Sequence, residues 1–384
     1  MKDLKLLLET EDGTERMVKE CIETVANSSG VIIFGAGVGG LSIYNILRKY
    51  RYLDKIVAFA DNNPLKQGNS YCENRLVIEN PSILFEKYGD SVTIIIASSA
   101  YDVIREQLIK YGFKKDRVLL YNFAFMNIEY SDKDFIYDHI SDFERAYKRM
   151  SDDKSRAIFT LILNYRITKD PIFLEKMHPY VDDEYFQYFD NELIEYNENE
   201  IFLDVGAYTG DTLRVFNEIY PKWAFYIGLE ADKKIYARLH ATINELQIQD
   251  NVKLINAAAW DEKTKLLFTD NPGASTVSDG DMGETVDAII VDDILDSSDV
   301  SFIKMDIEGA EWNALNGMRK IIKRNKPILA ICVYHKRDDF YKLTDLIDEI
   351  YPNVYHFYFR QYRYTPTETV CYAIPDRRLK SETN

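Results

Sequence analysis

The sequence contains few cysteines, and they are not spaced for a structural metal or a disulfide framework. Only four occur in 384 residues, and no two of them form a Cys-x-x-Cys pair. Structural zinc sites and disulfide-rich folds depend on closely spaced cysteines. We therefore expect buried, reduced thiols of a cytoplasmic protein at Cys21, Cys72, Cys332 and Cys371.

The sequence also contains fewer basic than acidic residues. The 47 lysines and arginines are outnumbered by 63 aspartates and glutamates, which gives a net charge of −16. Phosphate contacts need clustered lysine and arginine, so this balance argues against a nucleic-acid partner. It fits an enzyme whose partners are small or neutral molecules.

Long apolar runs are missing as well. No run reaches the roughly 20 residues that span a bilayer, and the first residues do not lead into the apolar region of a signal peptide. We therefore expect no membrane partner and a cytoplasmic location. No feature of the sequence predicts an oligomeric state.

Two stretches of the chain alternate between strand and helix patterns. In the first, helical patterns separate short apolar runs of the kind that lie buried in a parallel sheet. A helix interrupted near Asp12-Gly13 precedes the runs, which cover residues 31–34, 56–60, 92–97 and 118–121. The alternation predicts a small doubly wound domain, which we place at residues 1–130.

Residues 131–199 differ in character. Acids, tyrosines and phenylalanines recur there at helical spacing, and no strand pattern of comparable quality is present. We predict a helical connector between two sheets.

Strand and helix patterns alternate again over residues 200–384. The apolar runs cover residues 201–205, 225–230, 252–257, 289–291, 302–306 and 328–333. The last two strand patterns, 354–359 and 369–374, have no helix between them, which predicts an antiparallel hairpin at the sheet edge. The predicted fold class is α/β, with two Rossmann-like doubly wound sheets joined by a helical segment.

The segment 201–212 is the most informative part of the chain. A buried-strand run ends there in an acid and two glycines, Asp204-x-Gly206-x-x-x-Gly210, and an amphipathic helix follows. Such a unit forms a crevice at the carboxyl end of the strand, where open α/β sheets bind ligands. The glycines allow the backbone to approach the ligand closely. A carboxylate suits a cationic group better than a pyrophosphate, which favours S-adenosylmethionine over a dinucleotide.

The next two strands end in residues that complement an adenosine. Glu230 lies at the end of the second strand, where a carboxylate accepts hydrogen bonds from both ribose hydroxyls. The third strand ends in Ala257, Ala258 and Ala259, which leave room for a flat base, and Trp260 is placed to cover it.

A second cluster of acids follows the fourth strand. Asp306 lies at the strand end, and Glu308 and Glu311 share one face of the helix that begins there. Acids in a first helical turn also stabilise the helix dipole, so these two have a purely structural alternative. Tyr334-His335 follows the next strand, and a histidine beside carboxylates in a crevice is a natural general base.

Four motifs of this second half occur together and in order. Over about residues 200–375 the sequence resembles the FkbM family of S-adenosylmethionine-dependent methyltransferases. One departure is Gln361 in Arg360-Gln361-Tyr362, where many members carry a histidine. The motifs that carry the resemblance are Asp204-x-Gly206-Ala207-Tyr208-x-Gly210-Asp211, Asp306-Ile307-Glu308-Gly309-Ala310-Glu311, Tyr334-His335 and Glu368-Thr369-Val370-x-Tyr372-Ala373.

The resemblance implies a class I methyltransferase fold, of which the closing hairpin is typical. It also implies O-methylation of a hydroxyl on a sugar, nucleotide sugar or glycan precursor, with S-adenosyl-L-methionine as cofactor. The residues that we expect to bind this cofactor are Asp204, Gly206, Ala207, Tyr208, Gly210, Glu230, Ala258, Trp260 and Asp306.

The implied reaction is a direct displacement in which the acceptor hydroxyl attacks the sulfonium methyl group. Most of the acceleration comes from placing oxygen and methyl at near-attack distance, and proton removal adds about 10² to 10⁴. The candidate catalytic residues are His335, then Glu308, with Asp306 beside them. These three residues could alternatively hold a divalent metal that binds a sugar diol, although we expect a metal-free site.

The first domain carries a nucleotide-binding fingerprint. Gly35-x-Gly37-x-x-Gly40 follows a strand and opens a helix, and Asp61 lies at the end of the next strand. This context predicts a phosphate at the helix N-terminus and a ribose on Asp61, from a nucleotide, a nucleotide sugar or NAD(P).

Two alternative functions remain open. The first is an NAD(P)-dependent sugar-nucleotide oxidoreductase that uses the N-terminal fingerprint. A dehydrogenase-like Tyr-x-x-x-Lys pair occurs at Tyr111 and Lys115, and Gly112 between them predicts a helix end that would separate the two. The second is a non-catalytic nucleotide-binding module, against which the acids of the second half argue.

Overall fold

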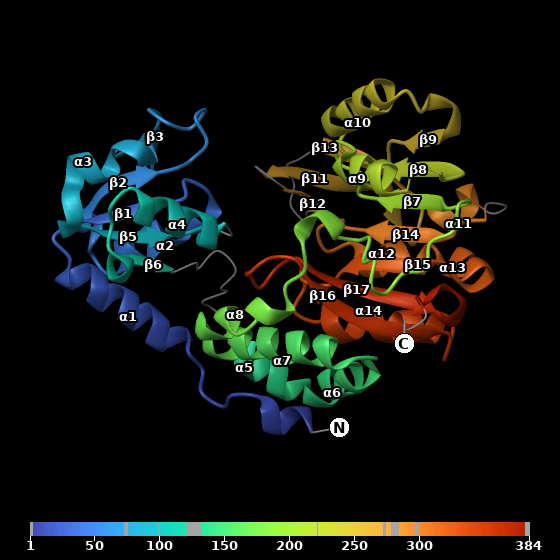
Figure 1. The fold of residues 1–384 in the computed structure, drawn as a ribbon, viewed down its shortest axis with the longest axis horizontal. Coiled ribbons are helices and arrows are strands. Elements are labelled where there is room, and N and C mark those ends of the chain that lie inside the picture. The colour runs from blue at the N-terminus through green and yellow to red at the C-terminus, as the bar shows by residue number, and fades with distance from the viewer. Residues whose placement is uncertain are drawn as a thin grey trace. The chain divides into compact units, whose positions relative to one another are not determined.

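The computed structural model describes residues 3–72, 76–98, 100–120, 132–220, 222–271, 274–277, 284–295 and 299–380. The chain forms two compact units, each with its own sheet and core (Figure 1). The N-terminal unit comprises residues 7–139 and 160–178, and the C-terminal unit comprises residues 1–6, 140–159 and 179–384. The predicted domain boundaries at residues 130 and 199 stay a prediction.

The N-terminal unit is built on a six-stranded sheet of order β3-β4-β2-β1-β5-β6, parallel except for β3. Four predicted strands are confirmed within one or two residues at their ends, while β3 and β4 were not predicted, and residue 121 lies outside the described residues. The strands are β1 (Val31–Phe34), β2 (Ile56–Ala60), β3 (Ser70–Tyr71), β4 (Leu76–Glu79), β5 (Thr93–Ile96) and β6 (Val118–Leu120).

Both faces of this sheet are buried. Val31 and Ile33 of β1 belong to one hydrophobic cluster, whereas Ile32 and Phe34 belong to another, as expected for a strand whose side chains alternate between two covered faces. The helices of this unit are α1 (Thr14–Asn27), α2 (Val38–Lys49), α3 (Leu84–Tyr88), α4 (Tyr101–Lys110), α5 (Asp132–Asp138) and α8 (Ile172–Glu175), and α7 (Asp153–Thr168) has residues in both units.

The C-terminal unit is built on a seven-stranded sheet of order β16-β17-β15-β14-β7-β8-β9. Figure 1 shows β8, β7, β14 and β15 following one another across this sheet. Strand β17 is antiparallel to both of its neighbours, so the predicted closing hairpin is confirmed. The strands are β7 (Ile201–Val205), β8 (Phe225–Leu229), β9 (Val252–Ile255), β14 (Phe302–Met305), β15 (Ile328–Cys332), β16 (Tyr355–Gln361) and β17 (Thr369–Pro375).

The helices between these strands complete the doubly wound α/β arrangement, and the predicted fold class is confirmed. Among the described residues, no helix combines the length and the hydropathy that a membrane span requires. The helices of this unit are α6 (Ile140–Arg149), α9 (Asp211–Ile219), α10 (Lys233–Leu246), α11 (Val291–Ile294), α12 (Glu311–Asn316), α13 (Arg319–Asn325) and α14 (Asp339–Ile350).

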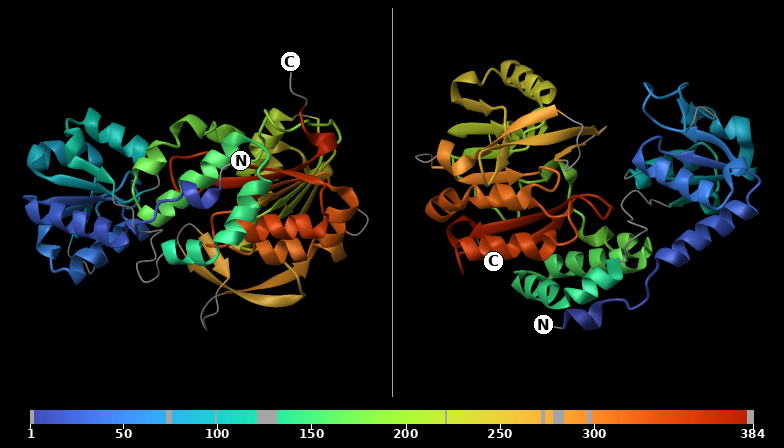
Figure 2. Two further views of the ribbon diagram at one scale, coloured as in Figure 1. Left: turned by 90° about the horizontal axis from the view of Figure 1, so that it is seen from below. Right: turned by 180° about the vertical axis from the view of Figure 1, so that it is seen from behind.

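A second sheet of the C-terminal unit was not predicted. It has the order β10-β13-β11-β12 and forms a layer of its own, yellow to orange in Figure 2. Residues 289–291 were expected in the main sheet, which is wrong, because residues 289 and 290 end β13 and pair with β10. Their apolar run does not reveal which sheet the strand joins. The strands are β10 (Ala258–Trp260), β11 (Thr264–Asn271), β12 (Ala274–Val277) and β13 (Glu284–Ile290).

An aromatic cluster fixes the segment that precedes β7. Phe189 is fully buried, and its ring centroid lies 5.7 Å from that of Phe202, 5.4 Å from that of Phe216 and 5.7 Å from that of Phe302. These contacts anchor Phe189 on the main sheet, and they thereby position the neighbouring Tyr188.

Candidate active site

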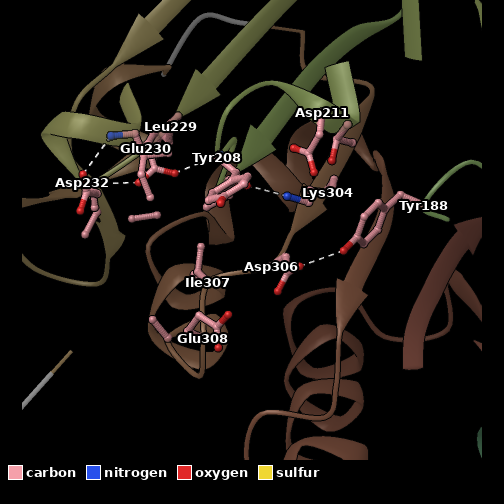
Figure 3. Close-up of a pocket in the computed structure, with 18 of the residues that line it drawn as sticks. Tyr188, Tyr208, Asp211, Leu229, Glu230, Asp232, Lys304, Asp306, Ile307 and Glu308 are labelled. Carbon is pink, nitrogen blue, oxygen red and sulfur yellow. Dashed lines mark hydrogen bonds between the residues drawn. The ribbon is translucent and has the colours of Figure 1, made fainter. Parts of the chain in front are cut away.

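A cavity of about 580 Å³ lies at the carboxyl ends of β7, β8 and β14 (Figure 3). Its volume is within the usual range for small-molecule sites. Five of the predicted cofactor-binding residues line it, namely Gly206, Tyr208, Glu230, Ala258 and Asp306. The crevice that the sequence predicts at these strand ends is therefore present.

The turn after β7 requires glycine at its first position. Gly206 has a φ of 81°, and a Cβ atom there would lie 2.0 Å from the carbonyl oxygen of Asp306. The absence of a side chain lets the β7 turn pack directly against the end of β14. This close approach brings the residues that follow the two strands into one cavity.

Glu230 is held by two backbone groups but retains acceptor capacity. Its Oε2 accepts the N–H of Tyr208 at 3.0 Å, and its Oε1 accepts the N–H of Asp232 at 2.8 Å (Figure 3). Burial raises the pKa of Glu230, and these two N–H groups oppose that rise. Each carboxylate oxygen offers two acceptor positions, so one on each remains for a ligand hydroxyl.

Asp204 does not face the cavity, contrary to the prediction. Its side chain is 0% exposed, its Oδ1 lies 3.1 Å from Lys304 Nζ, and Tyr226 donates its hydroxyl to Oδ2 at 2.9 Å. Lys304 lines the cavity and donates to the carbonyl oxygen of Gly206 at 2.6 Å. Asp204 therefore acts on the site through Lys304, because a carboxylate inside a strand must be neutralised where it is buried.

Lys304 stays charged in this position. Burial alone would lower its pKa, but the carboxylates of Asp204 and Asp306 raise it above the ordinary value. The sequence offered a signal for this residue, since a lysine between Ile303 and Met305 interrupts an otherwise apolar strand.

Three other predicted cofactor residues are also outside the cavity lining. Ala207 is fully buried, and Gly210, which has a φ of 83°, is the N-cap residue of α9. Trp260 lies in β10 of the second sheet, where its carbonyl oxygen would be 2.0 Å from a Cβ atom at Gly317. Trp260 is not among the residues that line the cavity, and its covering of an adenine stays a prediction.

The predicted catalytic residues come together. His335 Nε2 lies 3.4 Å from Asp306 Oδ1 and 3.6 Å from Glu308 Oε2, and its Nδ1 lies 2.9 Å from Glu311 Oε1. Asp306 and Glu308 line the cavity, while His335 lies behind them with a side chain only 7% exposed. Tyr188 donates its hydroxyl to Asp306 Oδ2 at 2.9 Å.

The acids change the proton affinity of this histidine. Burial alone would lower the pKa of His335, but the bond to Glu311 and the carboxylates of Asp306 and Glu308 raise it to about 9. Burial also raises the pKa of Glu308, which brings this cavity-lining carboxyl group closer to neutral pH.

Strained backbone is concentrated around the cavity. Ten described non-glycine residues have a positive φ, and four of these line the cavity. Such conformations cost about 1–3 kcal/mol each and persist mainly at functional sites. The four are Tyr188 (φ 73°), Tyr208 (φ 46°), Glu308 (φ 55°) and Glu368 (φ 68°).

Sequence reasoning missed one wall of the cavity. Tyr188 comes from the segment before β7, and Arg363 and Glu368 come from the β16–β17 loop. Gln361 shapes that loop, because its buried amide donates to the carbonyl oxygens of Arg363 and Thr365 at 2.9 Å each. No motif spacing could have placed Tyr188 or Arg363 in the cavity lining, and Glu368, which begins the fourth motif, was not predicted as a site residue.

The glycines of the N-terminal fingerprint lie in a different environment from those of the turn after β7. A Cβ atom at Gly35 would lie 2.8 Å from the carbonyl oxygen of Ala97, and one at Gly40 would lie 2.0 Å from that of Gly35. These two glycines are thus required by backbone packing alone. A Cβ atom at Gly37 would meet nothing within 4 Å.

The carboxylate of Asp61, the acid of this fingerprint, already accepts hydrogen bonds from its own chain. Asp61 Oδ2 accepts the N–H of Ala36 at 3.0 Å and the ammonium group of Lys66 at 2.9 Å, and Oδ1 accepts the N–H of Asn63 at 2.9 Å. Nucleotide binding by Gly35, Gly37, Gly40 and Asp61 stays a prediction.

Comparisons with known proteins agree with this architecture. Residues 204–364 match the model of the methyltransferase FkbM domain, and residues 27–119 match the model described as C2185-like, N-terminal. The crystal structure of methyltransferase FkbM from Methylobacillus flagellatus KT is 22% identical, covers 96% of each chain and has a TM-score of 0.68. No curated protein is detectably similar to the chain in sequence.

Two further solved structures are similar to about half of this chain. An rRNA methylase from Streptococcus thermophilus is 13% identical, with a TM-score of 0.33, over 55% of this chain and 98% of its own. Aeropyrum pernix fibrillarin with natively bound S-adenosyl-L-methionine is 13% identical, with a TM-score of 0.32, over 50% of this chain and 76% of its own. Residues 204–364 are therefore similar to the methyltransferase FkbM domain, and the chain shares its α/β fold with the Methylobacillus flagellatus structure.

Proposed function

We propose that the protein is an S-adenosylmethionine-dependent O-methyltransferase that acts on a hydroxyl of a sugar, nucleotide sugar or glycan precursor. The observation that carries this proposal is the cavity at the ends of β7, β8 and β14, with Glu230 on one side and Asp306 and Glu308 on the other. A cytoplasmic location and a small-molecule or glycan acceptor, without nucleic acid or membrane, belong to the same proposal.

The charge of the cavity favours a cationic cofactor. Seven acidic and four basic residues line it, so the excess is negative. A sulfonium ion gains from such a surrounding, whereas the pyrophosphate of a dinucleotide would be repelled. The remaining acceptor positions of Glu230 suit the two ribose hydroxyls of the adenosyl group.

Another part of the cavity lining suits an acceptor rich in hydroxyl groups. It presents charged and amide side chains that can donate to or accept from hydroxyls, namely Glu184, Gln187, Arg363 and Glu368. Recognition of a sugar by several directed hydrogen bonds requires such a wall.

The reaction transfers the methyl group in one displacement. The acceptor oxygen forms the new bond to carbon while the carbon–sulfur bond breaks, and its electron pair leaves the sulfur neutral in S-adenosylhomocysteine. The hydroxyl proton passes to a carboxylate. Glu308 suits this step better than His335, because Glu308 lines the cavity and burial raises its pKa, whereas the His335 side chain is only 7% exposed and does not line the cavity.

Calorimetric titration with S-adenosylmethionine and a transfer assay with labelled methyl donor test this proposal. We expect tight cofactor binding, and transfer to at least one member of a panel of nucleotide sugars and glycan precursors. Replacement Glu308→Gln should slow single-turnover transfer by about 10² to 10⁴. Tight binding of NAD(H) with none of S-adenosylmethionine would favour the oxidoreductase alternative instead.

The N-terminal unit is proposed to bind a nucleotide or the nucleotide end of an activated sugar at Gly35, Gly37, Gly40 and Asp61. Gly37→Asp tests this site, because a carboxylate at the N-terminus of α2 repels a phosphate while its Cβ has open space. We expect weaker use of a nucleotide-sugar acceptor with unchanged affinity for S-adenosylmethionine. Loss of both would contradict a separate nucleotide site.

A further inference from the structure

We propose that Asp306, Glu308 and His335 form a binding site for one divalent metal ion. Each residue offers one ligand atom, and the three atoms lie within 4.8 Å of one another. Two of the three residues line the cavity, so an ion bound here would be accessible to a ligand in it. Metal binding does not depend on methyl transfer, but the assignment of a role to the ion rests on the function proposed above.

The orientation of the histidine is that of a metal ligand. Its Nδ1 lies 2.9 Å from Glu311 Oε1, and because a carboxylate only accepts, Nδ1 is the donor. Metal-bound histidines usually donate their second ring nitrogen to such a carboxylate, which fixes the ring and its tautomer. Glu311 is itself held by the N–H of Ile307 at 3.0 Å and is 1% exposed.

The other ring nitrogen is left without a hydrogen-bond partner. His335 Nε2 is buried in a side chain that is 7% exposed, and it points between Asp306 and Glu308. A buried polar atom without a partner costs about 1–3 kcal/mol, so the arrangement calls for an occupant. The unpartnered Nε2 is an observation separate from the presence of two carboxylates in the cluster.

The distances leave room for an ion. Ligand atoms about 2.1 Å from a metal lie about 3.0 Å apart at a right angle and about 3.4 Å apart at a tetrahedral angle. The observed separations from Nε2 are 3.4 Å to Asp306 Oδ1 and 3.6 Å to Glu308 Oε2. The hydroxyl of Tyr188 occupies Asp306 Oδ2 and leaves Oδ1 for the ion.

The backbone turn between β14 and α12 brings the Glu308 carboxylate toward His335. Glu308 has a φ of 55° and Gly309 a φ of 95°, so two consecutive residues adopt left-handed conformations between β14 and α12. The turn places the Glu308 carboxylate 3.6 Å from His335 Nε2. A chain that needed acids only to cap α12 would not require this conformation.

The ligand set indicates the class of ion. Calcium and magnesium sites are built from oxygen atoms, whereas imidazole is a ligand for manganese, iron and zinc. Two carboxylates with one imidazole suit Mn²⁺ best, because it accepts both oxygen and nitrogen and keeps further positions open. Such an ion would polarise an acceptor hydroxyl, and two neighbouring hydroxyls of a sugar match two open positions.

Titration of the full chain with Mn²⁺, followed by the electron paramagnetic resonance signal of the free ion, tests the site. We expect one Mn²⁺ per chain, displaced by Zn²⁺ and not by Ca²⁺ at equal concentration. Glu311→Gln should weaken binding about 10- to 100-fold, because it removes only the support of the imidazole. Asp306→Asn, Glu308→Gln and His335→Gln should each weaken it further.

His356→Gln is the matched control. His356 also pairs with a carboxylate, that of Asp376, but its side chain is 44% exposed. This variant should bind Mn²⁺ as the unchanged protein does. Far-ultraviolet circular dichroism checks that each variant is folded.

The outcomes separate the metal site from the proposed function. Failure of the unchanged protein to bind Mn²⁺ or Zn²⁺, or equal binding by the variants of the three ligands, would overturn the metal site even if methyl transfer is found. Binding that is lost in those variants would support it even if no methyl acceptor is found.

Discussion

Two glycine-rich turns follow the first strand of a doubly wound sheet in this chain, and their surroundings differ. In the turn between β1 and α2, Asp61 is bonded to two backbone N–H groups and to Lys66. In the turn between β7 and α9, a cavity opens beside Gly206, and Glu230 is bonded to backbone N–H groups only. Glycine spacing thus reports how closely strand and helix pack, whereas ligand binding depends on what the acid of the next strand already contacts.

One added methyl group in the β7–α9 turn is expected to affect both stability and cofactor binding. Gly206→Ala places a Cβ atom 2.0 Å from the Asp306 carbonyl oxygen in a backbone with φ 81°. We expect a loss of about 2–5 kcal/mol in the free energy of unfolding of the C-terminal unit, and loss of S-adenosylmethionine binding. Urea unfolding and calorimetry measure the two effects.

Gly37→Ala is the matched variant in the other turn. Its φ of −143° is ordinary extended backbone, and its Cβ atom meets nothing within 4 Å. Its free energy of unfolding should stay within about 0.5 kcal/mol of the unchanged protein. Equal losses in both variants would contradict the contrast between the turns.

The two acid–lysine pairs offer the next contrast. Lys304 and Asp204 are 4% and 0% exposed, whereas Lys66 and Asp61 are 41% and 15% exposed. Lys304→Met leaves Asp204 buried without its counter-ion, so we expect a loss of about 3–5 kcal/mol in thermal or urea unfolding. Lys66→Met should cost at most about 1 kcal/mol, because solvent screens the exposed pair.

Removal of the charge at each acid tests ligand binding directly. Glu230→Gln should lower the affinity for S-adenosylmethionine about 10- to 100-fold, since hydrogen bonds to a charged acceptor contribute about 1.5–3 kcal/mol. Asp61→Asn should leave that affinity unchanged. Calorimetric titration measures the affinity of both variants for S-adenosylmethionine. If Asp61→Asn lowers this affinity as much as Glu230→Gln does, the assignment of the cofactor to the C-terminal cavity is wrong.

The smallest expected effect is a difference in the pH dependence of stability. Burial raises the pKa of Asp61, but bonds from Asn63, Lys66 and Ala36 lower it below its ordinary value of 3.8, so Asp61 stabilises the fold above that pH and loses its contribution on acidification. Burial raises the pKa of Glu230 above 4.5, so its ionisation destabilises the fold as pH rises through that window.

Urea unfolding between about pH 2 and pH 7 therefore distinguishes the two acids. Relative to the unchanged protein, Asp61→Asn should lose stability as the pH rises through the folded-state pKa of Asp61, which lies below 3.8, and Glu230→Gln should gain stability as the pH rises above 4.5. Shifts of the same sign would contradict the pKa directions.

The sequence predicts much of the fold because the relevant signals are local. Apolar runs such as 31–34 and 201–205 are strands within the expected limits, and the missing helix before residue 369 marks the hairpin. The second sheet was not predicted, because β10 and β13 pair across intervening segments and their short apolar runs resemble strands of the main sheet.

The candidate site, like the fold, could be predicted from the sequence only in part. Parallel strands end at one edge of a sheet, so Glu230, Asp306 and Glu308, which follow such strands, could be expected to lie near one another. Tyr188 joins them only because Phe189 is anchored in the aromatic cluster, a contact between distant parts of the chain. The inward direction of Asp204 depended on Lys304 in the neighbouring strand.

By itself, the sequence determined which residues follow the strands of each sheet, since periodicity and glycine turns are properties of neighbouring residues. The tertiary structure alone decided which acids are satisfied by their own chain and which keep free acceptor positions. That distinction arises from pairings between separate strands, where burial makes an unpaired charge costly and selects the partner that neutralises it.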